Sequence, residues 1–113
     1  MSAITAFQAM SKTYKANVTI SSQTITITPD GPCNQVLVTN TDATNEVYFL
    51  ISNAANVTVT IPAAGTPQYC LVSLPKNSKV FTVPYQFSPS APLYVAFIGN
   101  ATSTCFLTAG EGL

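Results

Sequence analysis

Apolar and polar residues alternate along the chain from about residue 16 onward, and this period of two limits the fold more than any other feature. The stretch NVTISSQTITITPDGP, residues 17–32, alternates Val and Ile with Ser, Thr and Gln before a Pro-Asp-Gly-Pro turn. Successive side chains of a strand point to opposite faces, so the pattern predicts strands with one buried face. The β-branched residues Thr, Val and Ile also suit a pleated surface. We therefore expect an all-β fold.

Further strands are predicted between turns that are rich in Pro and Gly. Their ranges are 33–40, 46–52, 57–61, 69–74, 79–83, 93–98 and 103–108. Short strands at this spacing are typical of a sandwich or barrel. We expect a single antiparallel β-sandwich of about eight short strands, jelly-roll-like, which occupies residues 16–113.

Three segments carry more specific expectations. The nearly all-apolar segment 46–52 predicts a central strand that is covered on both faces. Segments 93–98 and 103–108 predict a hairpin around the turn at 99–102. The segment PYQFSPSAP, residues 84–92, holds three prolines and predicts an irregular connection.

The N-terminal residues 1–15 differ from the rest of the chain. Ile4, Phe7, Met10 and Tyr14 recur near helical spacing, which predicts either an extended arm or a short helix. An apolar segment of this kind has to bury itself against something. We therefore treat these four residues as candidates for contact with a partner.

The scarcity of charge excludes several classes of function. Charged residues make up 7% of the chain, against about 25% in a common soluble domain, and the four lysines balance the four acids. Four lysines cannot form an extended phosphate-binding patch, so we expect no nucleic-acid partner. No apolar run approaches the length of a membrane span, and no secretory signal is recognisable, so we expect no membrane partner and no secretion.

The residues also offer little catalytic chemistry. The chain has no histidine, and Cys33, Cys70 and Cys105 lack metal-site spacing. We expect three free thiols, with Cys70 and Cys105 in the core. Asp42 and Glu46 flank one loop and are the remaining candidates for an acid–base pair, although turn chemistry also explains Asp42. We expect no enzyme activity, no metal and no cofactor.

Two aromatic residues lie in the proline-rich segment. For these residues the sequence favours neither a binding role nor packing in the core. Tyr85 and Phe87 are predicted on a loop, and aromatic residues on loops are common in binding surfaces. The chain ends in Thr-Ala-Gly-Glu-Gly-Leu. Its Glu111 points either to a partner or to solvent at a frayed terminus.

The C-terminal segment carries a resemblance to a known group of proteins. The stretch PLYVAFIGNATSTCFLTAGEGL, residues 92–113, runs as strand, polar turn, strand and a small-residue tail. It resembles the C-terminal hairpin of the head decoration, or cement, proteins of tailed bacteriophages. VLVTNTDATNEVYFLIS (36–52) looks like their paired strands around a polar turn, and IPAAGTPQYCLVSLPKNSKVFTVP (61–84) is similar to the segment that follows. The resemblance covers about residues 34–113.

The resemblance implies a non-enzymatic virion structural protein, made in the host cytoplasm. Such proteins bind the outer surface of the capsid and staple neighbouring subunits of the major capsid protein against internal DNA pressure. They are often homo-dimers or homo-trimers at a capsid symmetry axis. The alternative is a carbohydrate- or receptor-binding sandwich of a phage head fibre or tail, with Tyr85-Gln86-Phe87 as the binding residues.

Overall fold

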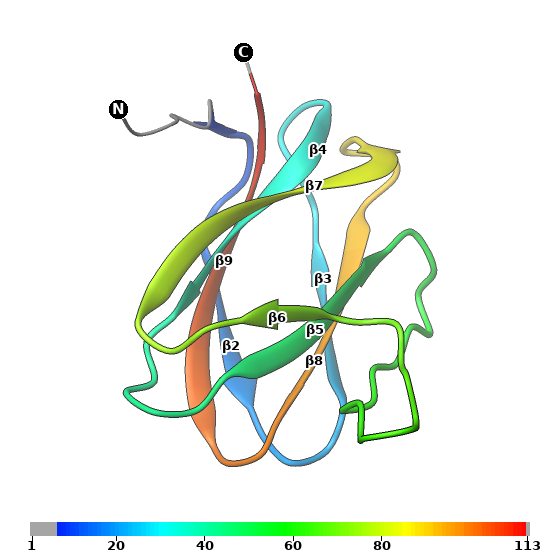
Figure 1. The fold of residues 1–113 in the computed structure, drawn as a ribbon. Coiled ribbons are helices and arrows are strands. Elements are labelled where there is room, and N and C mark those ends of the chain that lie inside the picture. Colours follow the sequence, from blue (N-terminus) through cyan, green and yellow to red (C-terminus); the bar gives the residue numbers. More distant parts are fainter. Residues whose placement is uncertain (1–6, 113) are drawn as a thin grey trace, which may run out of the picture.

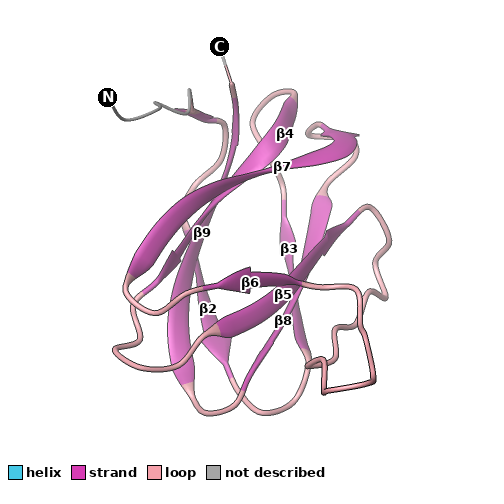
Figure 2. Ribbon diagram, in the orientation of Figure 1, coloured by secondary structure: helices cyan, strands magenta, loops and turns pink. Residues whose placement is uncertain are grey.

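The computed structural model describes residues 7–112, and it is an all-β protein (Figure 1). Figure 2 shows that the described chain consists of strands and loops. The nine strands are β1 (Gln8–Ala9), β2 (Tyr14–Val18), β3 (Gln23–Ile27), β4 (Cys33–Asn40), β5 (Val47–Ser52), β6 (Leu71–Ser73), β7 (Asn77–Phe87), β8 (Leu93–Gly99) and β9 (Ser103–Glu111).

The strands form two antiparallel sheets that pack face to face as a sandwich (Figure 1). The sheet that we call sheet A has the order β1-β9-β4-β7, and β2 also pairs with β9. Sheet B has the order β3-β8-β5-β6. The expectation of a single antiparallel β-sandwich is confirmed.

The pairing follows the winding of a jelly roll. β2 pairs with β9, β3 with β8, β4 with β7 and β5 with β6. The chain is therefore a long two-stranded ribbon that is folded over itself, and its layers join where β9 pairs with β4 and β8 with β5. Every connection from β2 to β9, except the one between β5 and β6, crosses from one sheet to the other.

Alternating apolar side chains fill the space between the sheets. On β4, β5 and β9 nearly every second residue is buried, as the period of two predicts. Phe49 of β5 contacts Phe81 of β7 edge to face, with ring centroids 4.9 Å apart. The largest core side chains come from both sheets and include Ile27, Val36, Val38, Phe49, Phe87, Leu93 and Val95.

The N-terminal segment forms strands and not the short helix that was one of its two predicted forms. β1 pairs with the end of β9, and β2 pairs with residues 103–107 of β9. An isolated short helix is marginal in water, whereas the edge of β9 offers backbone partners. Ile4 lies outside the described residues. Within residues 7–112, no helix is long and apolar enough to cross a membrane.

The predicted hairpin of residues 93–98 and 103–108 is wrong. β8 belongs to sheet B and β9 to sheet A, so the turn between them joins the two sheets. The amide of Gly99 donates to the Thr19 carbonyl of the neighbouring turn, at 2.9 Å, and not across a hairpin. The strands β4 and β5, in the segment 36–52, likewise lie in different sheets, so they are not the strand pair that the resemblance implied.

Two further boundaries differ from the prediction. Residues 57–61 form no strand, because Val57 and Val59 hydrogen-bond to the side chains of Thr24 and Ser22 and not to a backbone ladder. β7 continues through Pro84 to Phe87, where a connection was expected. This strand is at the edge of sheet A, where proline is tolerated because its missing N–H need not pair with a neighbour.

Candidate functional site

The N-terminal candidates lie against the sandwich of their own chain. Met10 and Tyr14 pack on the core, and the Tyr14 hydroxyl accepts a hydrogen bond from the Thr28 amide at 3.4 Å. The Met10 amide donates to the Ala109 carbonyl at 2.8 Å. The hydroxyls of Thr13 and Thr108 are 2.8 Å apart. These contacts hold the segment along β9.

The C-terminal tail continues the sheet up to Glu111. Glu111 is half-buried and pairs with Gln8 of β1. At Gly110, a Cβ atom would collide with the ring of Phe7 and lie 2.6 Å from the Gln8 carbonyl oxygen. The absence of a side chain at Gly110 therefore lets the Phe7 ring and β1 lie close to the end of β9.

Tyr85 and Phe87 have opposite environments. Phe87 is 1% exposed and belongs to the core, whereas Tyr85 is 40% exposed. Their ring centroids are 6.0 Å apart. The prediction that both lie on a loop is wrong, because β7 extends across them. Of this pair, only Tyr85 offers a ring to a partner.

Exposed apolar side chains gather where the edge strands of the two sheets meet. Tyr69 is 91% exposed, Leu74 57%, and Val72 and Tyr85 40% each. All four belong to β6, β7 or the residues next to β6, and we call them the β6–β7 surface. The sequence predicts a strand over residues 69–74, and no local pattern distinguishes the exposed Tyr69 from a core residue of such a strand.

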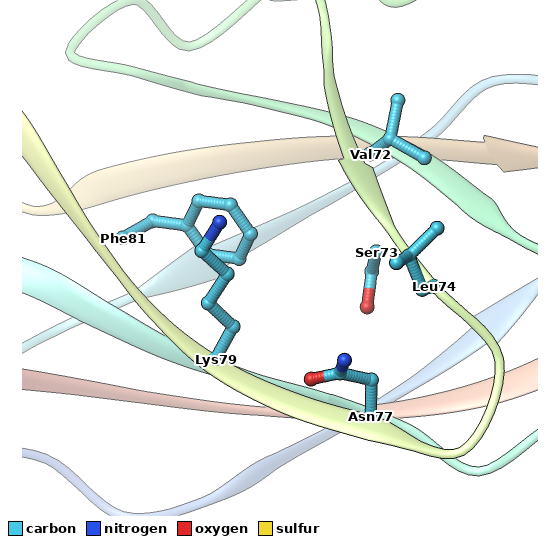
Figure 3. Close-up of a pocket in the computed structure, with 6 residues that line it drawn as sticks. All are labelled: Val72, Ser73, Leu74, Asn77, Lys79 and Phe81. Carbon is cyan, nitrogen blue, oxygen red and sulfur yellow. The ribbon is translucent and has the colours of Figure 1, made fainter. Parts of the chain in front are cut away.

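Two of the hollows along this surface are lined by strand residues of both sheets. The larger, of about 320 Å³, is lined by Leu50 and Ile51 of β5, by residues 69–71 and by residues 82–85 of β7. The smaller, of about 110 Å³, lies between β6 and the start of β7 (Figure 3). In it the ammonium group of Lys79 is 5.4 Å from the centroid of the Phe81 ring, a cation–π contact. Among residues 7–112, Lys79 is the one charged residue that lines either of these two hollows.

The carboxylates of the β4–β5 loop, Asp42 and Glu46, accept hydrogen bonds from neighbouring residues of the chain. Asp42 accepts the amide hydrogens of Thr44 and Asn45, at 3.0 and 2.6 Å, and these bonds lower the pKa of its carboxyl group. Glu46 accepts a hydrogen bond from the Tyr48 hydroxyl at 3.0 Å. The pKa of Tyr48 is raised mainly by burial and, to a smaller extent, by its hydrogen bond to Glu46. Residues 7–112 contain no group of three potential metal-ligating side chains.

All three cysteines are free thiols, as predicted. Burial, reinforced by the charge of Asp42, raises the pKa of Cys105 to about 11. Burial and the charge of Glu111 also raise the pKa of Cys33. Cys70 differs from its predicted core position, because it is half-buried, precedes β6 and lines the larger hollow.

Sequence reasoning missed the structural role of Asn40. This side chain is 1% exposed at the end of β4, and its amide donates to the carbonyls of Asn45 and Ser73. Its oxygen accepts the amide hydrogen of Asp42 at 3.0 Å. Asn40 therefore joins the β4–β5 loop to the edge strand β6. Its place in an alternating strand gives no signal, because the same pattern would fit an exposed asparagine.

The protein is therefore an antiparallel β-sandwich with jelly-roll pairing. Its β6–β7 surface exposes apolar side chains where the edge strands of the two sheets meet. Comparisons with protein-family models, with curated proteins and with solved structures gave no match for this chain.

Proposed function

We propose that the protein is a non-enzymatic virion component that binds the outer face of a bacteriophage capsid. It staples neighbouring subunits of the major capsid protein, as a homo-dimer or homo-trimer at a symmetry axis. The observation that supports this most is the β6–β7 surface, whose four apolar side chains are exposed beside two hollows. Apolar patches of this kind are typical of surfaces that meet another protein.

The charge pattern favours the same function. The chain carries four lysines and four acids in 113 residues, so long-range electrostatic repulsion between copies is weak. Binding through apolar contacts and hydrogen bonds is also little affected by salt. Both properties suit a protein that works as many copies on one lattice, where each copy adds a small stabilising term.

The test is co-sedimentation of the purified protein with mature, undecorated phage heads, followed by cryo-electron microscopy. We expect saturable binding and density that repeats across the shell. The double variant Leu74→Ala/Tyr85→Ala should bind less, because it removes apolar contacts from the β6–β7 surface. Phe106→Ala removes a 37% exposed ring from the middle of β9, a strand that is separated from β7 by β4 and is not part of the β6–β7 surface, and is the matched control. Absence of binding to heads would reject the proposal.

One observation favours the alternative, a carbohydrate-binding module. Tyr69, Gln68 and Pro67 line a further hollow of about 270 Å³, and the Tyr69 ring is almost fully exposed. An exposed ring beside a side-chain amide can stack on a sugar and hydrogen-bond to its hydroxyls. A glycan array tests this function: a hit that Tyr69→Ala abolishes would support it, and an array without hits would exclude it.

A further inference from the structure

Strand β5 has an open edge next to the larger hollow. β5 runs from Val47 to Ser52, and all six of its residues pair with β8 on one side. On the other side β6 pairs only with the first three, from Val47 to Phe49. Leu50, Ile51 and Ser52 therefore have no strand partner on that side among residues 7–112, and we call this stretch the open β5 edge.

The larger hollow borders the open β5 edge, because Leu50 and Ile51 are among the residues that line it. β6 begins at Leu71, opposite Phe49, and the two residues before it, Tyr69 and Cys70, do not pair with β5 but line the hollow of about 320 Å³. On the opposite side β7 bulges, because a single residue of β4, Asn34, faces residues 83–86 of β7. Part of this bulge, with the Tyr85 ring, forms the far wall of the hollow.

We propose that the open β5 edge takes an extended segment of a partner protein, which adds to sheet B in line with β6. An extended peptide carries N–H and C=O groups at strand spacing, so it can pair with the backbone of residues 50–52, and this backbone pairing would provide the affinity. A sugar or a compact small molecule lacks this regular spacing. The inference goes beyond the proposed function, because the segment can belong to a capsid protein or to any other partner protein.

The lining of the hollow defines the chemistry of that segment. Residues 50–51, 69–71 and 82–85 include no charged side chain, so a charge in the centre of the segment would lose its hydration without a partner. Alternate side chains of an added strand point to the two faces of the sheet, and one set would contact Tyr69 and Tyr85. The segment is therefore uncharged, with apolar residues at alternate positions.

The test measures binding of synthetic peptides to the full chain by fluorescence anisotropy. The probe is an acetylated peptide of about seven residues that alternates Thr and Val. One control carries an N-methyl group on its central residue, and another carries Lys there. We expect the probe to bind about tenfold more tightly than the N-methyl peptide, which lacks one backbone donor. The Lys peptide should bind more weakly still.

Matched variants and hydrogen exchange locate the bound peptide. Tyr85→Ala should weaken binding several-fold and Phe106→Ala should not, while the amides of the open β5 edge should exchange more slowly when peptide is bound. Failure of the probe to bind, equal binding of the N-methyl peptide, or protection of β5 by self-association without peptide would each overturn the inference. Peptide binding without binding to phage heads would leave the inference intact and reject the proposed function.

Discussion

Phe87 and Tyr85 lie two residues apart on β7, yet a mutation at each should have a different effect. Phe87→Ala removes a fully buried ring and should lower the free energy of unfolding by about 3–5 kcal/mol. Tyr85→Ala removes a ring that is 40% exposed and should cost about 1 kcal/mol or less. Urea denaturation followed by circular dichroism measures both. If Phe87→Ala does not fold, Phe87→Leu should still show a loss larger than that of Tyr85→Ala. Equal losses would place both rings in the same environment.

The thiol of Cys105 gives the protein a dependence on alkaline pH. Its pKa is raised from 9.0 to about 11 in the folded state by burial and then by Asp42. Below about pH 9 both states keep the proton and stability is unaffected. Between about pH 9 and pH 11 the unfolded chain loses the proton while the folded chain retains it, so the free energy of unfolding falls by up to about 3 kcal/mol. Denaturation at a series of pH values measures this loss.

The variant Cys105→Ala isolates the contribution of that thiol. All other titratable groups are the same in the two proteins, so the comparison removes their effect. The variant should be less stable at neutral pH, because it leaves a cavity, but its stability should fall less steeply above about pH 9. Parallel curves for the two proteins would show that the folded state accommodates the thiolate.

At the scale of the element, Asn40 connects β4 of one sheet to β6 of the other. Asn40→Ala leaves the Asn45 and Ser73 carbonyls and the Asp42 amide without this partner. We expect a loss of about 2–4 kcal/mol in the free energy of unfolding, since unpaired buried polar groups are costly. Thr39→Val is the matched control: it removes the bond to the Ser78 hydroxyl on the outer face of the same strand, and should cost about 0.5 kcal/mol. Urea denaturation of both variants decides whether the buried amide matters more.

The strands themselves could be predicted from the sequence, but their pairing could not. The alternation on β3, β4 and β9 reflects burial of one face, which a local pattern records. Whether β8 pairs with β9 or with β5 depends on contacts between residues that are distant in the chain, and the turn at 99–102 fits both cases. Residues 57–61 have strand composition, but Val57 and Val59 bond to the side chains of Thr24 and Ser22 and not to a strand backbone. Phe87 was misplaced because Pro84 predicts a break, although an edge strand tolerates proline.

The candidate site was predictable only in part, for a related reason. Tyr85 was proposed from its position among prolines, and it lies on the β6–β7 surface. Tyr69, Val72 and Leu74 were assigned to a strand because their segment is apolar. Their exposure arises because β6 pairs with only three residues of β5 and forms the edge of sheet B. Edge position is a property of the whole topology, so no local signal could reveal it.

At the scale of the molecule, the N-terminal segment protects the free edge of β9. Residues 1–13 include β1, the Met10 amide that donates to Ala109, and the Ser11 hydroxyl that accepts the Ala109 amide hydrogen at 2.9 Å. Their deletion would expose the backbone of the last residues of β9. We expect the free energy of unfolding to fall by about 2–4 kcal/mol. We also expect self-association that depends on concentration, because a bare strand edge pairs with other copies.

Urea denaturation and analytical ultracentrifugation of the deletion variant test both parts of this prediction. Lys12→Ala in the full chain is the control, since Lys12 is exposed in the same segment and should change neither property. A deletion variant that is as stable and as monodisperse as the full chain would show that residues 1–13 do not protect β9. Lower stability without self-association would separate the two effects: the contacts to Ala109 would matter for folding, while the exposed edge would be shielded by other means. Because the chain carries so few charges, little electrostatic repulsion opposes association, so the deletion is a sensitive test of whether β1 covers an edge that would otherwise pair.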